Sequence, residues 1–176
     1  AGLLVLLFLF HATNTVVYLA REHLPPHFDP AYHFGLSIDY YRVLEEDGLA
    51  GLARLHNVSG YYPPLYHVLA SLLYWFLPMQ EDVACGLNLA FLGLLIVSTY
   101  GLGRYLYNSR TGLVGAILVT CYPMVMGMVR LLYIDSALLA LVAAGTWLSV
   151  ACDHFRHRRK SVAVGVVCGC GLLTKW

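Results

Sequence analysis

Six long apolar runs, each with at most one formal charge, most constrain what this chain can fold into. They cover residues 1–20, 63–78, 84–105, 112–129, 136–152 and 161–176. About 20 apolar residues let a helix cross the roughly 30 Å hydrocarbon core of a bilayer, and several of these runs approach that length. Residues 87–97 and 137–144 lack the polar face that a helix of a soluble bundle carries. The pattern predicts an all-α, polytopic transmembrane helical bundle of about five to six apolar helices.

Charges and cysteines point to no other class of protein. Only 12% of the residues are charged and the net charge is +1, with no basic face, so we expect no nucleic-acid partner. The five cysteines lie in apolar runs without a C-x-x-C pair, which is typical of small buried side chains. Because the chain begins inside one apolar run and ends just after another, we expect an N-terminal fragment of a larger membrane protein. Residues 1–20 are then the remainder of a first transmembrane helix.

The basic loops predict how the chain is oriented. Short loops rich in Lys and Arg stay on the cytoplasmic side. Residues 154–160 hold four Lys or Arg residues, and residues 103–111 hold Arg104 and Arg110. Both loops are therefore predicted to be cytoplasmic, and the turn at 130–135 to be outside. The run 63–78 is short, about 24 Å as a helix, so we favour a segment that dips into the bilayer and returns. That arrangement leaves residues 21–62 as an outer loop, followed by further membrane helices over 63–176.

Asp29 and Pro30 begin a candidate helix in this loop. Asp is a preferred N-cap residue, and Pro is preferred at the first helical position. The apolar positions that follow are Ala31, Phe34, Ile38 and Tyr41. Their spacing of three and four predicts an amphipathic interfacial helix that ends near Gly48. Asp29 either only caps this helix or also does chemistry, and the two roles are compatible because a cap fixes the carboxylate.

Histidines gather in the same part of the chain. They are His23, His27, His33, His56 and His67. Together with Asp29 they suggest a divalent metal site, but Pro25 and Pro26 break the register between the first two, so no ligand spacing is defined. We favour interfacial histidines without a metal. His33 follows Asp29 by four residues, about one helical turn, and is expected to reach it.

Charged residues also flank the outer turn. Arg130 and Asp135 lie at its two ends, and a lone charge at bilayer depth costs about 3 kcal/mol, so mutual pairing is the simplest expectation, and it is compatible with a function. Lys175, near the end of the last apolar run, is open to the same two interpretations: it pairs with another charge, or it also has a function.

Four short segments connect these features in chain order. They read F-D-P-A-Y-H-F at 28–34, Y-Y-P-P-L-Y at 61–66, V-R-L-L-Y-I-D-S at 129–136 and G-L-L-T-K-W at 171–176. In this order, and between these apolar runs, they resemble the GT-C superfamily of membrane glycosyltransferases, in particular its protein O-mannosyltransferase and lipid A aminoarabinose transferase branch. That branch usually has Glu where Pro30 stands, and often Lys or His where Tyr62 stands.

The resemblance implies a glycosyltransferase that moves a sugar from a polyprenyl-phosphate donor to a protein, lipid or glycan acceptor at the outer face of the membrane. Asp29 is implied as the general base, with inversion at the anomeric carbon, and Arg130 or Lys175 as the group that faces the phosphate. The further substrate contacts would be His33, His67 and Asp135, and Asp135 would orient Arg130. The donor and membrane lipids are the expected partners. No cofactor is implied with certainty, and a divalent metal ion stays open. The fragment alone is expected to be inactive, since the family's C-terminal part helps to bind both substrates.

A multi-pass transporter and a non-catalytic membrane scaffold are the alternatives. Polar groups in membrane segments also mark transport paths, but transporters commonly contain internal repeats, and we find none here. In a scaffold, Asp29 and Arg130 would only cap and pair. We expect an integral membrane protein of the bacterial plasma membrane, or of the endoplasmic reticulum if the source is eukaryotic, where the sequon at Asn57 would be read.

Overall fold

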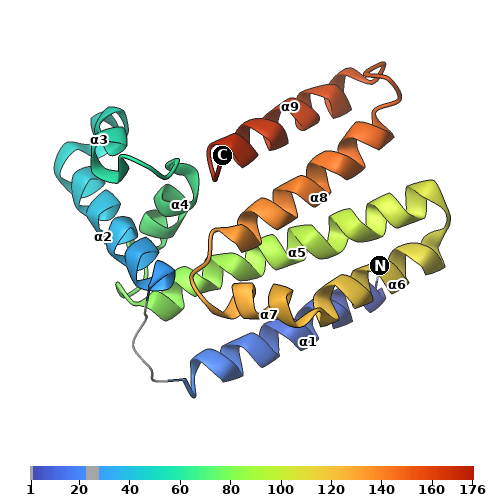
Figure 1. The fold of residues 1–176 in the computed structure, drawn as a ribbon, viewed down its shortest axis with the longest axis horizontal. Helices are drawn as coiled ribbons and strands as arrows, with labels where there is room; N and C mark the ends of the chain where they lie inside the picture. Colours follow the sequence, from blue (N-terminus) through green and yellow to red (C-terminus); the bar gives the residue numbers. More distant parts are fainter. Residues whose placement is uncertain (1, 23–27) are drawn as a thin grey trace.

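A computed structural model describes residues 2–22 and 28–176, and every regular element in these ranges is a helix (Figure 1). The elements are α1 (Gly2–Leu19), α2 (Asp29–Asp47), η1 (Gly48–Arg54), α3 (Leu55–Ser59), α4 (Leu65–Leu73), α5 (Glu81–Leu106), α6 (Ser109–Cys121), α7 (Pro123–Arg130), α8 (Asp135–Ala151) and α9 (Arg158–Leu172). The predicted all-α bundle is confirmed. His23, Pro25, Pro26 and His27, which entered the metal-site hypothesis, lie outside the described residues.

α5 is the central helix of the bundle. It contacts α1, α4, α6, α7 and α8. A Cβ added at Gly101 of α5 would lie 2.3 Å from the ring of Trp147 in α8, and one added at Gly112 of α6 would lie 2.5 Å from the carbonyl oxygen of Tyr100. Small residues allow such close approach between helices, as is common in membrane bundles.

Helix length separates candidate spans from shorter elements. α1 and α5 are long and apolar enough to cross a membrane, and α6 with α7 forms a third candidate if the pair, bent by 63°, is one span. The bend lies at Tyr122 and Pro123, because proline lacks a backbone N–H and disfavours helical geometry at the residue before it. α8 is apolar but has only 17 residues. The chain is thus a helical membrane bundle with two or three candidate spans, fewer than its apolar runs.

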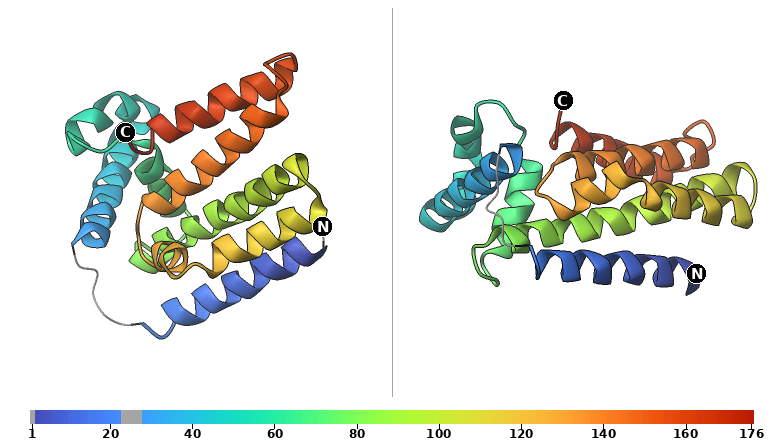
Figure 2. Two further views of the ribbon diagram at one scale, coloured as in Figure 1. Left: turned by 45° about the vertical axis from the view of Figure 1, so that its right-hand side comes forward. Right: turned by 60° about the horizontal axis from the view of Figure 1, so that its bottom comes forward.

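The helices α2, α3 and α4 form a group at one end of the bundle (Figures 1 and 2). The run 63–78 contains only the nine-residue α4, which packs against α2 and α5 and does not run along the bundle. The turn between α7 and α8 lies at this end too, which we call the α2 end. The loops after α5 and α8 lie at the other, which we call the basic end (Figure 1). The basic loops and residues 130–135 therefore lie at opposite ends of the bundle, and the side of the membrane that each end faces stays a prediction.

α2 agrees with the predicted amphipathic helix in its length. It ends at Asp47, and Gly48 follows with φ +58°, a backbone conformation that favours glycine. The face it buries is turned by about one residue from the predicted one. Its buried residues are Pro30, His33, Leu36, Ser37, Tyr40 and Leu44. The predicted apolar positions Phe34, Ile38 and Tyr41 are half-buried beside them. His33 and Ser37 lie on the buried face with hydrogen-bond partners at His67 and Tyr74, which apolar periodicity does not predict.

Candidate active site

Asp29 lies at the α2 end, as the first residue of α2. Phe28, with φ 53°, occupies the N-cap position, and no side chain caps the helix. The predicted cap is therefore wrong by one position. Asp29 instead lies in the first turn, where the helix dipole favours a negative charge, and it is exposed. Its carboxylate is accessible to a ligand.

Asp135 and Lys175 form an ion pair at the same end of the bundle. Lys175 Nζ donates to Asp135 Oδ1 at 2.8 Å, with about a third of each side chain exposed. The segment that carries Lys175 is fixed by two further bonds. The Leu65 backbone N–H donates to the Leu173 carbonyl at 2.9 Å, and the buried Thr174 hydroxyl donates to the Cys170 carbonyl at 2.8 Å. The end of α9 is thus attached to the start of α4.

Asp29, His33 and Tyr62 lie close enough to this ion pair to interact with it electrostatically. Burial lowers the pKa of His33, and the carboxylates of Asp29 and Asp135 partly oppose that effect. The hydrogen bond to Asp135 raises the pKa of Lys175, with smaller contributions in the same direction from Tyr62 and Asp29. Residues far apart in sequence therefore gather at one place. An exposed carboxylate near an ammonium group can take a proton from a hydroxyl group while the cation stabilises an anion.

His33 and His67 form a buried pair beneath these groups. His33 Nδ1 lies 3.0 Å from His67 Nε2, and the two side chains are 2% and 0% exposed. Aromatic rings surround them; those in contact are Tyr32, Tyr40, Tyr62 and Tyr66. Both histidines were predicted to contact substrate. Their contact joins α2 to α4, and contact with substrate stays a prediction.

Burial of this pair predicts a pH-dependent stability. Burial and the neighbouring His33 lower the pKa of His67 to about 3, whereas an unfolded chain protonates histidine near its ordinary pKa of about 6.5. Between these values the unfolded state binds more protons, so stability falls as the pH falls below about 6.5. At about pH 5 we expect a loss of roughly 2 kcal/mol relative to neutral pH, measurable as the free energy of unfolding in detergent.

Two variants test whether the pair of His33 and His67 causes this pH dependence. His67→Gln should reduce the difference between the two pH values, whereas His56→Gln, which changes an exposed histidine of α3, should leave it intact. An unchanged pH dependence in folded His67→Gln protein would contradict the assignment.

Asn88 of α5 is a buried hydrogen-bonding centre that sequence reasoning missed. Its side-chain oxygen accepts from the Tyr66 hydroxyl at 2.8 Å and from the Ser136 hydroxyl at 2.7 Å. Its side-chain nitrogen donates to the carbonyls of Met128, Val129 and Leu131. Asn88 thereby connects α4, the end of α7 and the start of α8, where Asp135 lies. The available signal was a lone amide inside an apolar run, since a polar group at such a position needs a partner.

Arg130 does not pair with Asp135, and that prediction is wrong. Arg130 Nη2 donates to the side-chain oxygen of Asn14 in α1, and the guanidinium carbon lies 4.9 Å from the centre of the Tyr18 ring. Arg130 ends α7 and faces α1, whereas Asp135 begins α8 and faces the segment after α9. The two charges therefore belong to different places at the α2 end.

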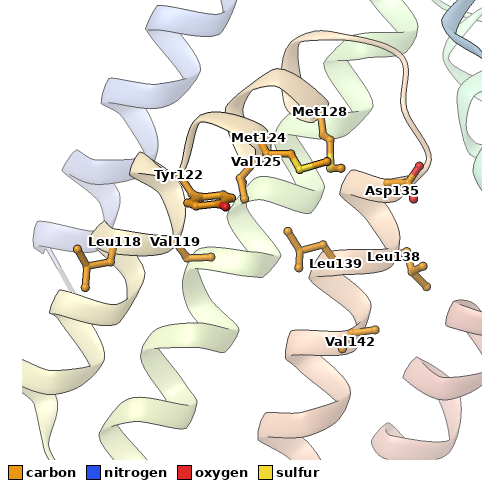
Figure 3. Close-up of a pocket in the computed structure, with 10 residues that line it drawn as sticks. All are labelled: Leu118, Val119, Tyr122, Met124, Val125, Met128, Asp135, Leu138, Leu139 and Val142. Carbon is orange, nitrogen blue, oxygen red and sulfur yellow. The ribbon is translucent and has the colours of Figure 1, made fainter.

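An apolar groove of about 700 Å³ opens beside Asp135, between the bend of α6 and α7 and the first turns of α8 (Figure 3). Its lining residues are Leu118, Val119, Tyr122, Met124, Val125, Met128, Asp135, Leu138, Leu139 and Val142. Asp135 is the one charged residue among them, and Figure 3 shows its carboxylate at the edge of the groove. The ion pair with Lys175 thus borders an apolar surface.

No group of three or more His, Cys, Asp or Glu side chains in the described ranges is arranged to hold a metal ion. The two buried histidines use ring nitrogens on each other instead.

Comparison with known families decides the class. The sequence model of the dolichyl-phosphate-mannose-protein mannosyltransferase family matches residues 62–176, well over half of the chain. The chain belongs to this family. It is therefore a membrane protein of the GT-C glycosyltransferase type, as its four segments predicted. No curated protein and no solved structure matches the chain. The match includes His67, Asn88, Asp135 and Lys175 and begins after Asp29, so the geometry at the α2 end is what connects Asp29 to the family's segment.

Proposed function

We propose that this chain carries the catalytic acid–base group of a glycosyltransferase that uses a polyprenyl-phosphate sugar as donor, at the outer face of the membrane. The supporting observation is that Asp29, Asp135 and Lys175 gather at the α2 end, away from the basic loops. Membership of a mannosyltransferase family favours this function over a transporter or a scaffold. The bacterial plasma membrane, or the endoplasmic reticulum in a eukaryote, is the proposed location.

In the proposed reaction Asp29 acts as general base. Its carboxylate takes the proton of the acceptor hydroxyl as that oxygen attacks the anomeric carbon. The bond between this carbon and the donor phosphate breaks, and the phosphate leaves with the electron pair. Direct displacement inverts the configuration at the anomeric carbon. A phosphate is already a good leaving group, so stabilising its charge matters more than protonating it.

Lys175 is the proposed group that faces the leaving phosphate. It lies within electrostatic range of Asp29, and its ammonium group is partly exposed, whereas Arg130 is directed to α1. Asp135 holds Lys175 in place. The apolar groove beside this pair is suited to the isoprenoid chain of the donor, since it is lined almost wholly by apolar side chains. His33 and His67 support α2 from beneath.

The experiment is a transfer assay on the full-length protein, with labelled sugar carried either by a polyprenyl phosphate or by a nucleotide. We expect transfer from a polyprenyl phosphate and none from a nucleotide. Lys175→Gln should lower the rate by about a hundredfold, because a positioned cation is lost and Asp135 is left without its partner. Arg110→Gln, at the basic end, is the matched control and should retain full activity.

A double variant separates the two effects of the lysine change. Lys175→Gln with Asp135→Asn removes the unpaired carboxylate, so part of the rate should return. Transfer from nucleotide sugars alone would contradict the proposed function. Full activity of a folded Lys175→Gln protein would contradict the proposed role of Lys175.

A further inference from the structure

A second cavity lies at the α2 end where α1 meets α7, away from Lys175. It has a volume of about 310 Å³ and is lined by Asn14, Val17, Tyr18, Arg21, Glu22 and Arg130. Its charged groups are two guanidinium groups and one carboxylate, so its net charge is positive. The Tyr18 hydroxyl donates to Glu22 Oε2 at 3.5 Å, within the same cavity. Such a cavity favours an anion over a cation.

Arg130 is fixed in this cavity with hydrogen-bonding capacity left over. A guanidinium group has five N–H donors. One nitrogen donates to Asn14, the plane lies over the ring of Tyr18, and Nε is buried with no hydrogen-bond partner. None of the four ion pairs found in the described ranges includes Arg130. A rigid guanidinium group of this kind suits a phosphate, whose oxygens can accept two N–H bonds at once.

An apolar stripe on α1 continues directly from this cavity. A shallow groove of about 480 Å³ is lined by Leu6, Leu9, Phe10, Thr13, Asn14 and Val17. Asn14 and Val17 line both hollows, so the basic cavity and the groove are continuous. Leu6, Leu9 and Phe10 are exposed, on a helix that is a candidate membrane span. The combined surface has a positive end near Arg130 and an apolar path along α1 toward the basic end.

We propose that this surface binds a lipid with an anionic phosphate head group, with the phosphate at Arg130 and Arg21 and one hydrocarbon chain along α1. The charge at one end and the apolar stripe at the other match the two parts of such a molecule. The proposed occupant is a phospholipid of the bilayer, because the groove lies over exposed residues of a candidate membrane span. A polyprenyl phosphate is the alternative that the test distinguishes. The site is separate from the Asp135–Lys175 pair, and the inference does not depend on the proposed transfer reaction.

The test uses photoactivatable lipids and the full-length protein in phosphatidylcholine nanodiscs. A small fraction of photoactivatable phosphatidylglycerol is added, and labelled peptides are mapped by mass spectrometry. We expect label on residues 6–17 from phosphatidylglycerol and much less from an equally labelled phosphatidylcholine. Arg130→Gln should reduce the label about fivefold, since one basic residue near an anionic lipid is worth about that factor. Arg104→Gln, which changes a basic residue at the opposite end, should leave it unchanged.

Two further arms complete the test. Arg21→Gln changes an exposed residue of the same cavity and should also reduce the label, which gives a readout even if Arg130→Gln protein does not fold. Unlabelled phosphatidylglycerol and polyprenyl phosphate are then compared as competitors. Stronger competition by phosphatidylglycerol supports the proposed occupant, and stronger competition by polyprenyl phosphate overturns it. Equal labelling by phosphatidylcholine, or wild-type labelling in both arginine variants, overturns the proposal.

Discussion

Asp29→Asn should lower the rate of sugar transfer by about 10²–10⁴-fold, the range by which a positioned general base accelerates a reaction. The change keeps the size of the side chain and removes its ability to take a proton. Because Asp29 is exposed and does not cap α2, the fold should be unaffected. Donor binding should change little, since in the proposed mechanism Lys175 and the apolar groove hold the donor. Single-turnover transfer and donor affinity measured on the same preparation separate the two quantities.

The matched control for this prediction is Asp39→Asn. Asp39 lies in the same helix, is exposed, and only makes a 3.7 Å ion pair with Arg42. Exposed pairs of this kind contribute about 0–1 kcal/mol to stability, so activity should stay near the wild-type value. Asp29→Glu should retain part of the activity, because it keeps the base and displaces it. A stably folded Asp29→Asn protein with near-normal turnover would exclude Asp29 from catalysis.

Asn88→Ala should destabilise the protein by about 3 kcal/mol, because it removes an acceptor shared by two buried hydroxyls and the donor to three carbonyls. The same change should impair transfer, even though Asn88 touches no substrate. Its bonds fix the end of α7 and the start of α8, and so the position of Asp135. Unfolding in a denaturing detergent, followed by tryptophan fluorescence, measures the first effect.

Asn108→Ala is the comparison for this variant. Asn108 is exposed and caps α6 by accepting from the backbone N–H groups of Arg110 and Thr111 at 3.0 Å each. Loss of such a cap typically costs about 1 kcal/mol. An Asn88→Ala protein that is no less stable than Asn108→Ala would show that the buried network contributes little.

The sequence predicted those parts of the fold that depend on local composition. The apolar runs predicted the helices. The start of α2 was predicted from Asp29 and Pro30 and its end from Gly48, each to within one residue. Pro123 could have predicted the bend between α6 and α7, but residues 112–129 were interpreted as one apolar segment. Helix rotation was predicted less well, because the buried face of α2 contains His33 and Ser37, whose burial depends on partners in other parts of the chain.

The sequence identified candidate residues for the site but not which of them contact one another. Asp29, Asp135 and Lys175 were named from the sequence and its resemblance to a family. They lie at one end of the bundle, and their roles stay predictions. The partner of Asp135 was missed because Arg130 is near in sequence, whereas Lys175 becomes near only when α9 packs against α8. Asn88 was missed for the same reason, since its five partners come from three other places in the chain. Long-range pairing follows from how helices pack, and one sequence carries little information about that.

The attachment of residues 173–175 to α4 and α8 has a consequence for biosynthesis. Asp29, the proposed acid, is synthesised before Lys175, the proposed cation, and the hydrogen bond from Leu65 to Leu173 fixes the segment that carries Lys175. While the ribosome is still producing α9, the early helices can insert into the bilayer, but the centre has no ammonium group. In the proposed mechanism, the nascent chain therefore lacks its phosphate-facing cation until α9 has been made.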